Sequence, residues 1–162
     1  MASNVETIST ERLLLRGIDE SDTEEIVKWR SNPEAYKYFK DPHEITVEEH
    51  TNWFRNRYPY NEARYDRMCI EKASGNRIGV FGIVREGDTA EVNYILAPEA
   101  QHRGYATEGV RALMDYAAQK WGTRKIIAEI HEDNEPSIIM VRKMGFTLAQ
   151  HKDRFVIYEF EV

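Results

Sequence analysis

The stretch from residue 89 to residue 122 constrains the fold more than any other part of the chain. Residues 89–96 alternate between apolar and polar side chains, which predicts a strand with one buried face. A short turn containing Gly104 follows, and apolar residues then recur at helical spacing over residues 107–120. A strand that leads through a short turn into an amphipathic helix packs that helix on its sheet. This half of the chain therefore combines a sheet with a covering helix.

The remaining segments predict further short strands and helices in alternation. Strands are expected at residues 12–17, 67–72, 77–84, 125–131, 147–150 and 155–161. Helices are expected at residues 21–30, 33–38, 46–57 and 134–144, with capping boxes at Ser21–Glu24 and Thr46–Glu49. Short turns between the middle strands predict an antiparallel meander. The predicted class is α+β, with one domain over residues 1–162, a mixed and mostly antiparallel sheet, and helices on both faces.

Net charge and hydrophobicity argue against several classes of function. The formal net charge is −6, so the field of the whole molecule repels nucleic acid and mildly attracts a cationic amine. No run approaches the ~20 apolar residues that span a bilayer. Residues 1–10 lack the basic start and the apolar run of a signal peptide. We therefore expect a soluble, cytoplasmic protein with no nucleic-acid partner and no membrane partner.

The single cysteine and the scattered histidines argue against disulfide or metal chemistry. Cys69 is the only cysteine, so no internal disulfide can form, as is usual in a reducing cytoplasm. It lies in an alternating apolar run, a pattern typical of a packed side chain rather than a nucleophile. Histidine and cysteine do not cluster at ligand spacing, so we expect no metal.

The segment Gln101–Ala106, with the sequence Gln-His-Arg-Gly-Tyr-Ala, is the candidate ligand loop. The small residues Gly104 and Ala106 let a ligand approach the backbone closely. Free N–H groups and partial positive charge at a helix start can hold a pyrophosphate. The chain has neither the Gly-x-x-x-x-Gly-Lys-Ser/Thr loop of P-loop proteins nor a Gly-x-Gly-x-x-Gly after its first strand. A coenzyme A loop is the remaining option.

This loop resembles the Arg/Gln-x-x-Gly-x-Gly/Ala signature of the GNAT superfamily of N-acetyltransferases. Three neighbouring segments resemble the family in the expected order, namely Leu96–Glu99, Asp133–Ser137 and Lys143–Phe146. The resemblance spans residues 91–146, and the first strand and paired helices upstream also fit. It implies a GNAT fold, whose sheet splays between its fourth and fifth strands. It also implies an enzyme that transfers acetyl from acetyl-CoA to a primary amine by direct attack in a ternary complex.

The same resemblance implies the contacts to acetyl-CoA. Backbone groups of three residues would pair with the pantetheine arm like an added strand, namely Ile95, Leu96 and Ala97. The amides that would hold the pyrophosphate belong to Gln101, His102, Arg103, Gly104, Tyr105 and Ala106. Asn134 would act as a helix N-cap, as a cofactor contact, or as both.

An ammonium must lose a proton before it attacks a thioester, so the reaction needs a general base. Glu91 on the fourth strand is the first candidate, and it can also bind the ammonium. Glu129 and His131 on the fifth strand are alternatives, His131 because imidazole titrates near neutral pH. The structural interpretation of Glu91 is a solvated strand carboxylate.

The departing thiolate needs a proton or a hydrogen bond. Many family members place a tyrosine seven residues after the position of Asn134, where this chain has Val141. Ser137 matches the serine of the branch that acetylates ribosomal-protein N-termini, so we assign it to the sulfur, with helix capping as the alternative. The missing tyrosine also permits a module that binds acetyl-CoA without turnover.

The first two helices are expected to select the amine. Their segments Trp29–Glu34 and Glu48–Phe54 resemble a branch that acetylates nucleotide-linked amino sugars. There Arg30 would pair with a diphosphate, and His50 and Trp53 would complete the substrate site. Aromatic residues at helical spacing are more often part of a core.

Two other acceptors stay open. A ribosomal-protein N-terminus is favoured by Ser137 and by the Ala-Thr-Glu that follows Tyr105. A polyamine or an aminoglycoside suits the net negative charge. A homodimer is compatible with this fold, although no residue predicts one.

Overall fold

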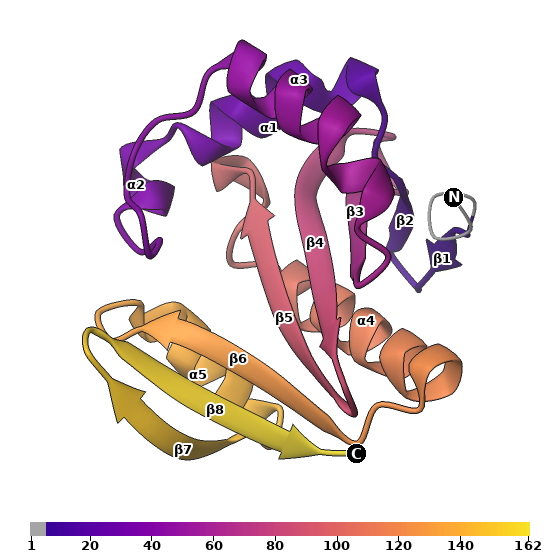
Figure 1. The fold of residues 1–162 in the computed structure, drawn as a ribbon. Helices are drawn as coiled ribbons and strands as arrows, with labels where there is room; N and C mark the ends of the chain where they lie inside the picture. The colour runs from indigo at the N-terminus through magenta and orange to yellow at the C-terminus, as the bar shows by residue number, and fades with distance from the viewer. Residues whose placement is uncertain (1–5) are drawn as a thin grey trace.

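An eight-stranded sheet organises the computed structural model, which describes residues 6–162 (Figure 1). The strands are β1 (Ile8–Ser9), β2 (Leu13–Gly17), β3 (Arg64–Glu71), β4 (Arg77–Glu86), β5 (Thr89–Leu96), β6 (Lys125–His131), β7 (Thr147–Lys152) and β8 (Phe155–Glu161). They lie in the order β1-β2-β3-β4-β5-β6-β8-β7. The β5–β6 pair is parallel and the other neighbours are antiparallel. The predicted α+β class is confirmed.

Helices cover both faces of this sheet. The first group consists of α1 (Thr23–Arg30), α2 (Pro33–Tyr36) and α3 (Val47–Asn56). The second group consists of α4 (Tyr105–Trp121) and α5 (Glu135–Lys143), which lie on the other side (Figure 1). Residues 6–162 also contain the short 3-10 helices η2 (Glu20–Asp22), η3 (Tyr58–Tyr60) and η4 (Pro98–Ala100).

The helix ends test the predicted caps. Thr46 caps α3 as predicted, because its hydroxyl accepts the Glu49 N–H at 3.0 Å. The predicted capping box at Ser21 is wrong. The box is formed by Asp19 and Asp22 around η2, and Ser21 instead donates its N–H to Asp19. Carboxylates accept hydrogen bonds more strongly than a hydroxyl does, so Asp19 and Asp22 form the capping box in place of Ser21.

Helix α4 is the longest helix and forms one wall of the core. Its predicted apolar face is buried, namely Val110, Leu113, Met114 and Ala117. It begins at Tyr105, two residues before the predicted start, because Gly104 turns the chain with a φ of +80°. Gly109 faces β4, where an added Cβ would collide with the Phe81 ring. This close approach lets α4 pack tightly on the sheet.

Strands β5 and β6 form a fork. They pair only from Thr89 to Glu91 on β5 and from Lys125 to Ile127 on β6, although each strand continues for several residues. Figure 1 shows the two strands diverging beyond this paired end. Main-chain groups on the facing edges beyond the pairing are therefore available to a ligand. The predicted splay between these two strands is confirmed.

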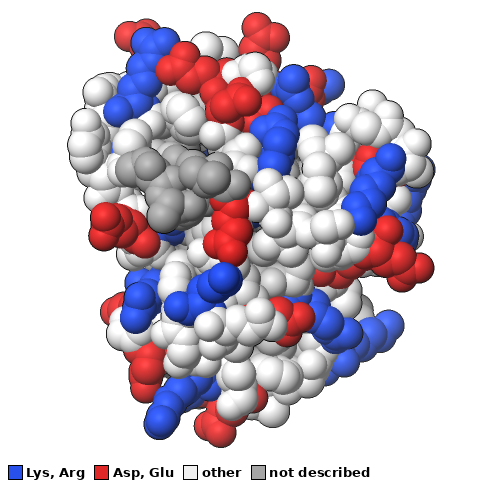
Figure 2. Space-filling view, turned by 90° about the vertical axis from the view of Figure 1, so that its right-hand side faces the viewer, with Lys and Arg blue, Asp and Glu red and all other residues white. Residues whose placement is uncertain are grey.

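Surface and helix properties bear on the predicted partners. On the face drawn in Figure 2, acidic and basic side chains are interspersed. No helix among residues 6–162 is long and apolar enough to cross a membrane. In the same part of the chain, His, Cys, Asp and Glu side chains form no group of three arranged to hold a metal ion. The cytoplasmic location stays a prediction.

Candidate active site

The fork has two chemically different faces. Side chains alternate along β5, so Glu91 and Asn93 point to one face while Tyr94 points to the other. The register pairs Glu91 with Ile127, which puts Glu129 on the same face as Glu91. Tyr94 pairs with Phe81, and their rings stack on the side covered by α4. We call these surfaces the acceptor face (Asp66, Glu91, Asn93 and Glu129) and the cofactor face (Tyr94, Ser137 and residues 101–106).

The loop 101–106 presents its backbone at the start of α4. His102 has a φ of +65° and Gly104 a φ of +80°, so the loop curls tightly before the helix begins. The first N–H groups of α4 have no partner within the helix, and the helix dipole adds partial positive charge there. His102, Arg103 and Gly104 are exposed. The geometry is that of an anion-binding concavity.

Arg12 on the turn into β2 holds this loop in place. Its guanidinium donates to the Arg103 carbonyl at 2.8 Å and to Glu108 of α4 at 2.7 Å. The Arg12 N–H and the Thr10 hydroxyl also donate to Glu108. These bonds lower the pKa of Glu108 despite its partial burial. Sequence reasoning missed Arg12, because its partner lies 96 residues away.

Tyr105 adds a second tie to the loop. Its hydroxyl donates to Glu71 at the end of β3 at 2.6 Å, and the Arg12 guanidinium lies 4.4 Å from its ring centroid. The Tyr105 side chain is therefore a structural anchor, while its backbone belongs to the loop. The loop is held from two strands before any ligand arrives.

Ser137 and Tyr94 meet inside the fork. Ser137 opens α5 and is 9% exposed, and its hydroxyl lies 2.9 Å from the Tyr94 hydroxyl. Burial raises the pKa of Tyr94, and the Ser137 hydrogen bond offsets part of that rise. Val141 lies one turn further along α5 and is buried. Tyr94 was predicted only as part of an apolar strand face, so its hydroxyl is an addition that the structure makes.

Asn134 stands at the N-cap position of α5. Its side chain makes no capping hydrogen bond within residues 6–162, so the capping interpretation is wrong. The backbone is held instead by the Asn134 N–H, which donates to the His131 carbonyl at 2.9 Å. The amide side chain stays available to a ligand at the mouth of the fork.

Two carboxylates and one ammonium gather on the acceptor face. The Lys40 ammonium lies 2.7 Å from Glu129, and this pairing raises the pKa of Lys40. Burial raises the pKa of Glu91, the charge of Glu129 raises it further, and Lys40 acts against both. A carboxylate with a raised pKa is a stronger base than a solvated one. Glu91 is half-buried, and its role as the general base stays a prediction.

A third carboxylate lies deeper on the acceptor face. Asp66 of β3 is 3% exposed and accepts two hydrogen bonds from Arg64, at 2.9 and 3.0 Å. A Cβ at Gly82 would collide with the Asp66 carboxylate and lie 2.9 Å from the Asn93 amide oxygen. Gly82 therefore leaves room for both polar groups above the middle of the sheet. No local pattern in the sequence predicts this cluster.

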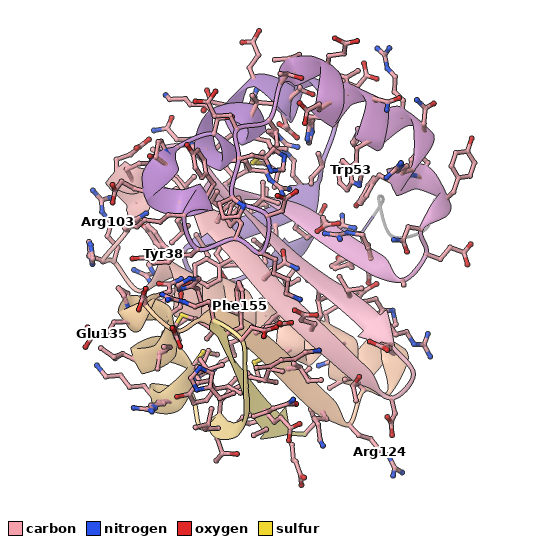
Figure 3. All side chains as sticks on the ribbon, turned by 60° about the vertical axis from the view of Figure 1, so that its left-hand side comes forward. Tyr38, Trp53, Arg103, Arg124, Glu135 and Phe155 are labelled. Atoms are coloured by element: carbon pink, nitrogen blue, oxygen red, sulfur yellow. The ribbon has the colours of Figure 1, made fainter. Side chains whose placement is uncertain are left out.

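His131 is a poor candidate for the base. Its Nδ1 accepts the Asp133 N–H at 3.0 Å, so the proton of the neutral ring resides on Nε2. The ring packs between Tyr38 and Phe155, with centroid distances of 5.6 and 5.3 Å. Figure 3 shows Tyr38 and Phe155 on the same side of the molecule. His131 thus links the segment after α2 to β8.

The three predicted substrate residues on the helices have different environments. His50 is 5% exposed, and its Nε2 has no hydrogen-bond partner in the described chain. Burial and the charge of Arg30 lower the pKa of His50, so it stays neutral. Trp53 is half-buried against Tyr58 and lies 5.9 Å from the Arg64 guanidinium, and Figure 3 labels it beside the helices. Arg30 is exposed and lies over the Phe39 ring.

Cys69 is inert as predicted. It is fully buried in β3, and burial raises the pKa of its thiol to about 12. A thiol with that pKa is almost entirely protonated at neutral pH, and it is not exposed to a substrate.

Comparison with known proteins agrees with this geometry. Residues 12–147 match the model of the acetyltransferase (GNAT) domain. The chain belongs to the GNAT acetyltransferase family. It is therefore an acyltransferase with acetyl-CoA as its cosubstrate.

The chain is also similar to three known proteins. The uncharacterized N-acetyltransferase YoaA of Bacillus subtilis is 29% identical, with 86% of this chain and 81% of that protein covered. The spermidine N(1)-acetyltransferase of Escherichia coli is 26% identical, with 86% and 75% covered. The structure of a Vibrio cholerae spermidine N-acetyltransferase with CoA and spermine superposes with a TM-score of 0.83 at 20% identity, with 94% and 96% covered. This last likeness shows the shared fold.

Proposed function

We propose that this GNAT enzyme acetylates a small polycationic amine, with a polyamine as the best-fitting substrate class. The observation that carries the proposal is the acceptor face, where Glu91 and Glu129 lie together and the chain's own Lys40 ammonium already binds Glu129 at 2.7 Å. A surface that holds one alkylammonium is suited to hold another. The similarity to a spermidine acetyltransferase supports the same substrate class.

The proposed mechanism uses both faces of the fork. Backbone amides of residues 101–106 hold the pyrophosphate, and the β5 edge at Ile95–Ala97 pairs with the pantetheine arm. The acceptor ammonium binds Glu129 and Glu91, and Glu91 removes one proton. The neutral nitrogen attacks the acetyl carbon, the C–N bond forms, and the C–S bond breaks with its electron pair on sulfur. Ser137 donates a hydrogen bond to that sulfur, and Asn134 contacts the pantetheine arm.

Most of the rate enhancement would come from positioning. Holding amine and thioester in line replaces a bimolecular encounter and can supply about 7–11 kcal/mol of the barrier. General-base removal of the proton adds roughly 10²–10⁴-fold. In this mechanism the amine and the thioester must approach the fork from opposite faces. The arrangement of Glu91 and Tyr94 on β5 satisfies that need.

The nucleotide-linked amino sugar remains the main competing acceptor. Exposed Arg30 and half-buried Trp53 could contact a nucleotide diphosphate, but His50 is buried and would have to move to reach one. On the acceptor face Lys40 pairs with Glu129 and Arg64 pairs with Asp66, so the negative charge that would repel the diphosphate is chiefly that of Glu91. A peptide N-terminus is the other competitor, and a basic peptide would share the attraction to these carboxylates.

The test is acetyl-CoA-dependent release of thiol across a panel of amines at matched concentrations. The panel contains spermidine, an aminoglycoside, a nucleotide-linked 4-amino sugar and ribosomal-protein N-terminal peptides. The proposal predicts the highest kcat/KM for spermidine and a fall in kcat/KM as salt rises, because the attraction is electrostatic. A preference for the nucleotide sugar or the peptide would overturn the polyamine assignment. Thiol release with none of these amines would favour an acetyl-CoA-binding module.

A further inference from the structure

Two hydroxyl groups form a hydrogen-bonded pair inside the fork. The Tyr94 and Ser137 oxygens lie 2.9 Å apart, and either can donate to the other. One belongs to a strand and the other to a helix start 43 residues later. Both groups lie beyond the last β5–β6 pair, where the strands have separated. The pair therefore lies at the point where the fork opens.

Packing fixes the direction of the Tyr94 hydroxyl. The Tyr94 ring stacks on Phe81 with centroids 5.6 Å apart and planes inclined by 18°. Phe81 is itself fully buried and fills the space left by Gly109 on α4. A ring clamped in this way cannot swing its hydroxyl out of the fork without disturbing the core. The contact with Ser137 is therefore part of a rigid arrangement.

We propose that Tyr94 and Ser137 act as a chain of two hydrogen-bond donors to the sulfur of coenzyme A, with Ser137 touching the sulfur and Tyr94 polarising Ser137. The inference rests on the proposed function, which places the sulfur in the fork. It adds Tyr94 to the reaction as the residue that positions and polarises the Ser137 hydroxyl.

The pKa values of the phenol and the thiol decide whether the Tyr94–Ser137 pair transfers a proton or only donates a hydrogen bond. A phenol ionises near pH 10 and a thiol near 8.5, and burial raises the pKa of Tyr94 further. Moving a proton completely from Tyr94 to a thiolate is therefore uphill. Donating a hydrogen bond to the thiolate is favourable, and a donor that is itself hydrogen-bonded donates more strongly. Tyr94 keeps its proton throughout the reaction.

The proton balance closes without ionising Tyr94. The acceptor ammonium gives one proton to Glu91 before attack, and Glu91 releases that proton to solvent before the next turnover. After attack the new amide nitrogen loses a second proton, and that proton protonates the thiolate through solvent. Between cleavage of the C–S bond and protonation of the sulfur, the Tyr94–Ser137 pair only lowers the energy of the thiolate. Tyr94 and Ser137 are therefore unchanged after each turnover.

The direct test is the pKa of the thiol of bound CoA, measured from thiolate absorbance as pH is raised on the CoA complex. We expect a thiol pKa below that of free CoA in the wild type. Tyr94→Phe should raise it by about half a unit to one unit, and Ser137→Ala by at least as much. Tyr94→Phe keeps the ring that stacks on Phe81, so it preserves the fold. Tyr65→Phe removes a hydroxyl from β3 on the same sheet face and should leave the thiol pKa unchanged.

The outcomes separate this inference from the proposed function. If CoA binds and both variants keep the wild-type thiol pKa, the hydroxyl chain is overturned while the function stands. If CoA does not bind to the wild type, the proposed function fails with it. A kinetic readout gives an independent check. The loss of kcat in Tyr94→Phe should shrink when acetyl-CoA is replaced by its selenoester, whose leaving group needs less stabilisation, whereas a merely structural defect would slow both donors equally.

Discussion

The cofactor face and the acceptor face of the fork are built in different ways. On the cofactor face, loop 101–106 offers main-chain groups and is held in place by Arg12, Glu108 and Tyr105. The acceptor face consists of side chains from several strands and one exposed lysine, including Glu91, Glu129 and Lys40. In the proposed mechanism the loop binds the pyrophosphate of acetyl-CoA, whereas the side chains distinguish one amine from another. A backbone site of this kind keeps its shape when side chains vary, and a side-chain site does not.

This difference also explains what could be predicted from the sequence. The loop 101–106, the long helix after it and the fork depend on local signals such as Gly104 and the strand–turn–helix order, so the prediction of the fold was correct. Glu91 was identified because it lies on the strand beside that loop. Lys40 and Arg12 were missed, because their partners are distant in sequence and the pairing is visible only in the folded chain. Asp66 was missed because the space around its carboxylate is set by Gly82 and Asn93 on other strands.

Tyr94 shows a subtler limit of sequence reasoning. The alternation of its strand correctly assigned it to the apolar face, on which Val92 and Leu96 are buried. The alternation could not show that its hydroxyl meets a helix start on the far side of the fork. His50 is the converse case, because a helix motif predicted a substrate contact and the fold buries the ring.

The largest effect should come from the acceptor face. Glu91→Gln keeps the shape of the side chain and removes the base, so kcat should fall by roughly 10²–10⁴-fold. Initial rates at saturating acetyl-CoA measure this loss. Wild-type kcat/KM should also fall on the acid side through the raised pKa of Glu91, because only the ionised carboxylate accepts a proton. In Glu91→Gln this fall in kcat/KM at low pH should be absent.

The matched control for this change is Glu161→Gln, at the exposed end of β8. It removes the same charge far from the fork and should leave kcat unaltered. Equal losses in both variants would show that net charge matters and that Glu91 is not the base.

An intermediate effect should come from the cofactor face. Arg12→Met removes the ties to the Arg103 carbonyl and to Glu108, so the loop loses part of its fixed shape. The KM for acetyl-CoA should rise about fivefold to tenfold, while kcat changes little. Arg111→Met, one turn along α4 on the surface, is the control. A fall in kcat with an unchanged KM would contradict the role of Arg12 in holding the loop.

The smallest effect should come from Lys40. Lys40→Met frees Glu129 for the substrate ammonium, so the KM for spermidine should fall by about threefold. The change is modest because the Lys40 side chain is 64% exposed. Lys37→Met, which breaks a surface pair with Glu34, should have no such effect. A higher KM for spermidine in Lys40→Met would indicate that Lys40 assists binding instead of competing with the amine.

The central claim is that donor and acceptor meet at the fork from opposite faces, and a crystal structure with CoA and spermidine tests it most directly. The claim predicts the CoA sulfur between β5 and β6, within about 3.5 Å of the Ser137 hydroxyl. It also predicts the nearest amine nitrogen on the other face, beside Glu91. A sulfur outside the fork, or an amine bound on the Tyr94 side, would contradict the account.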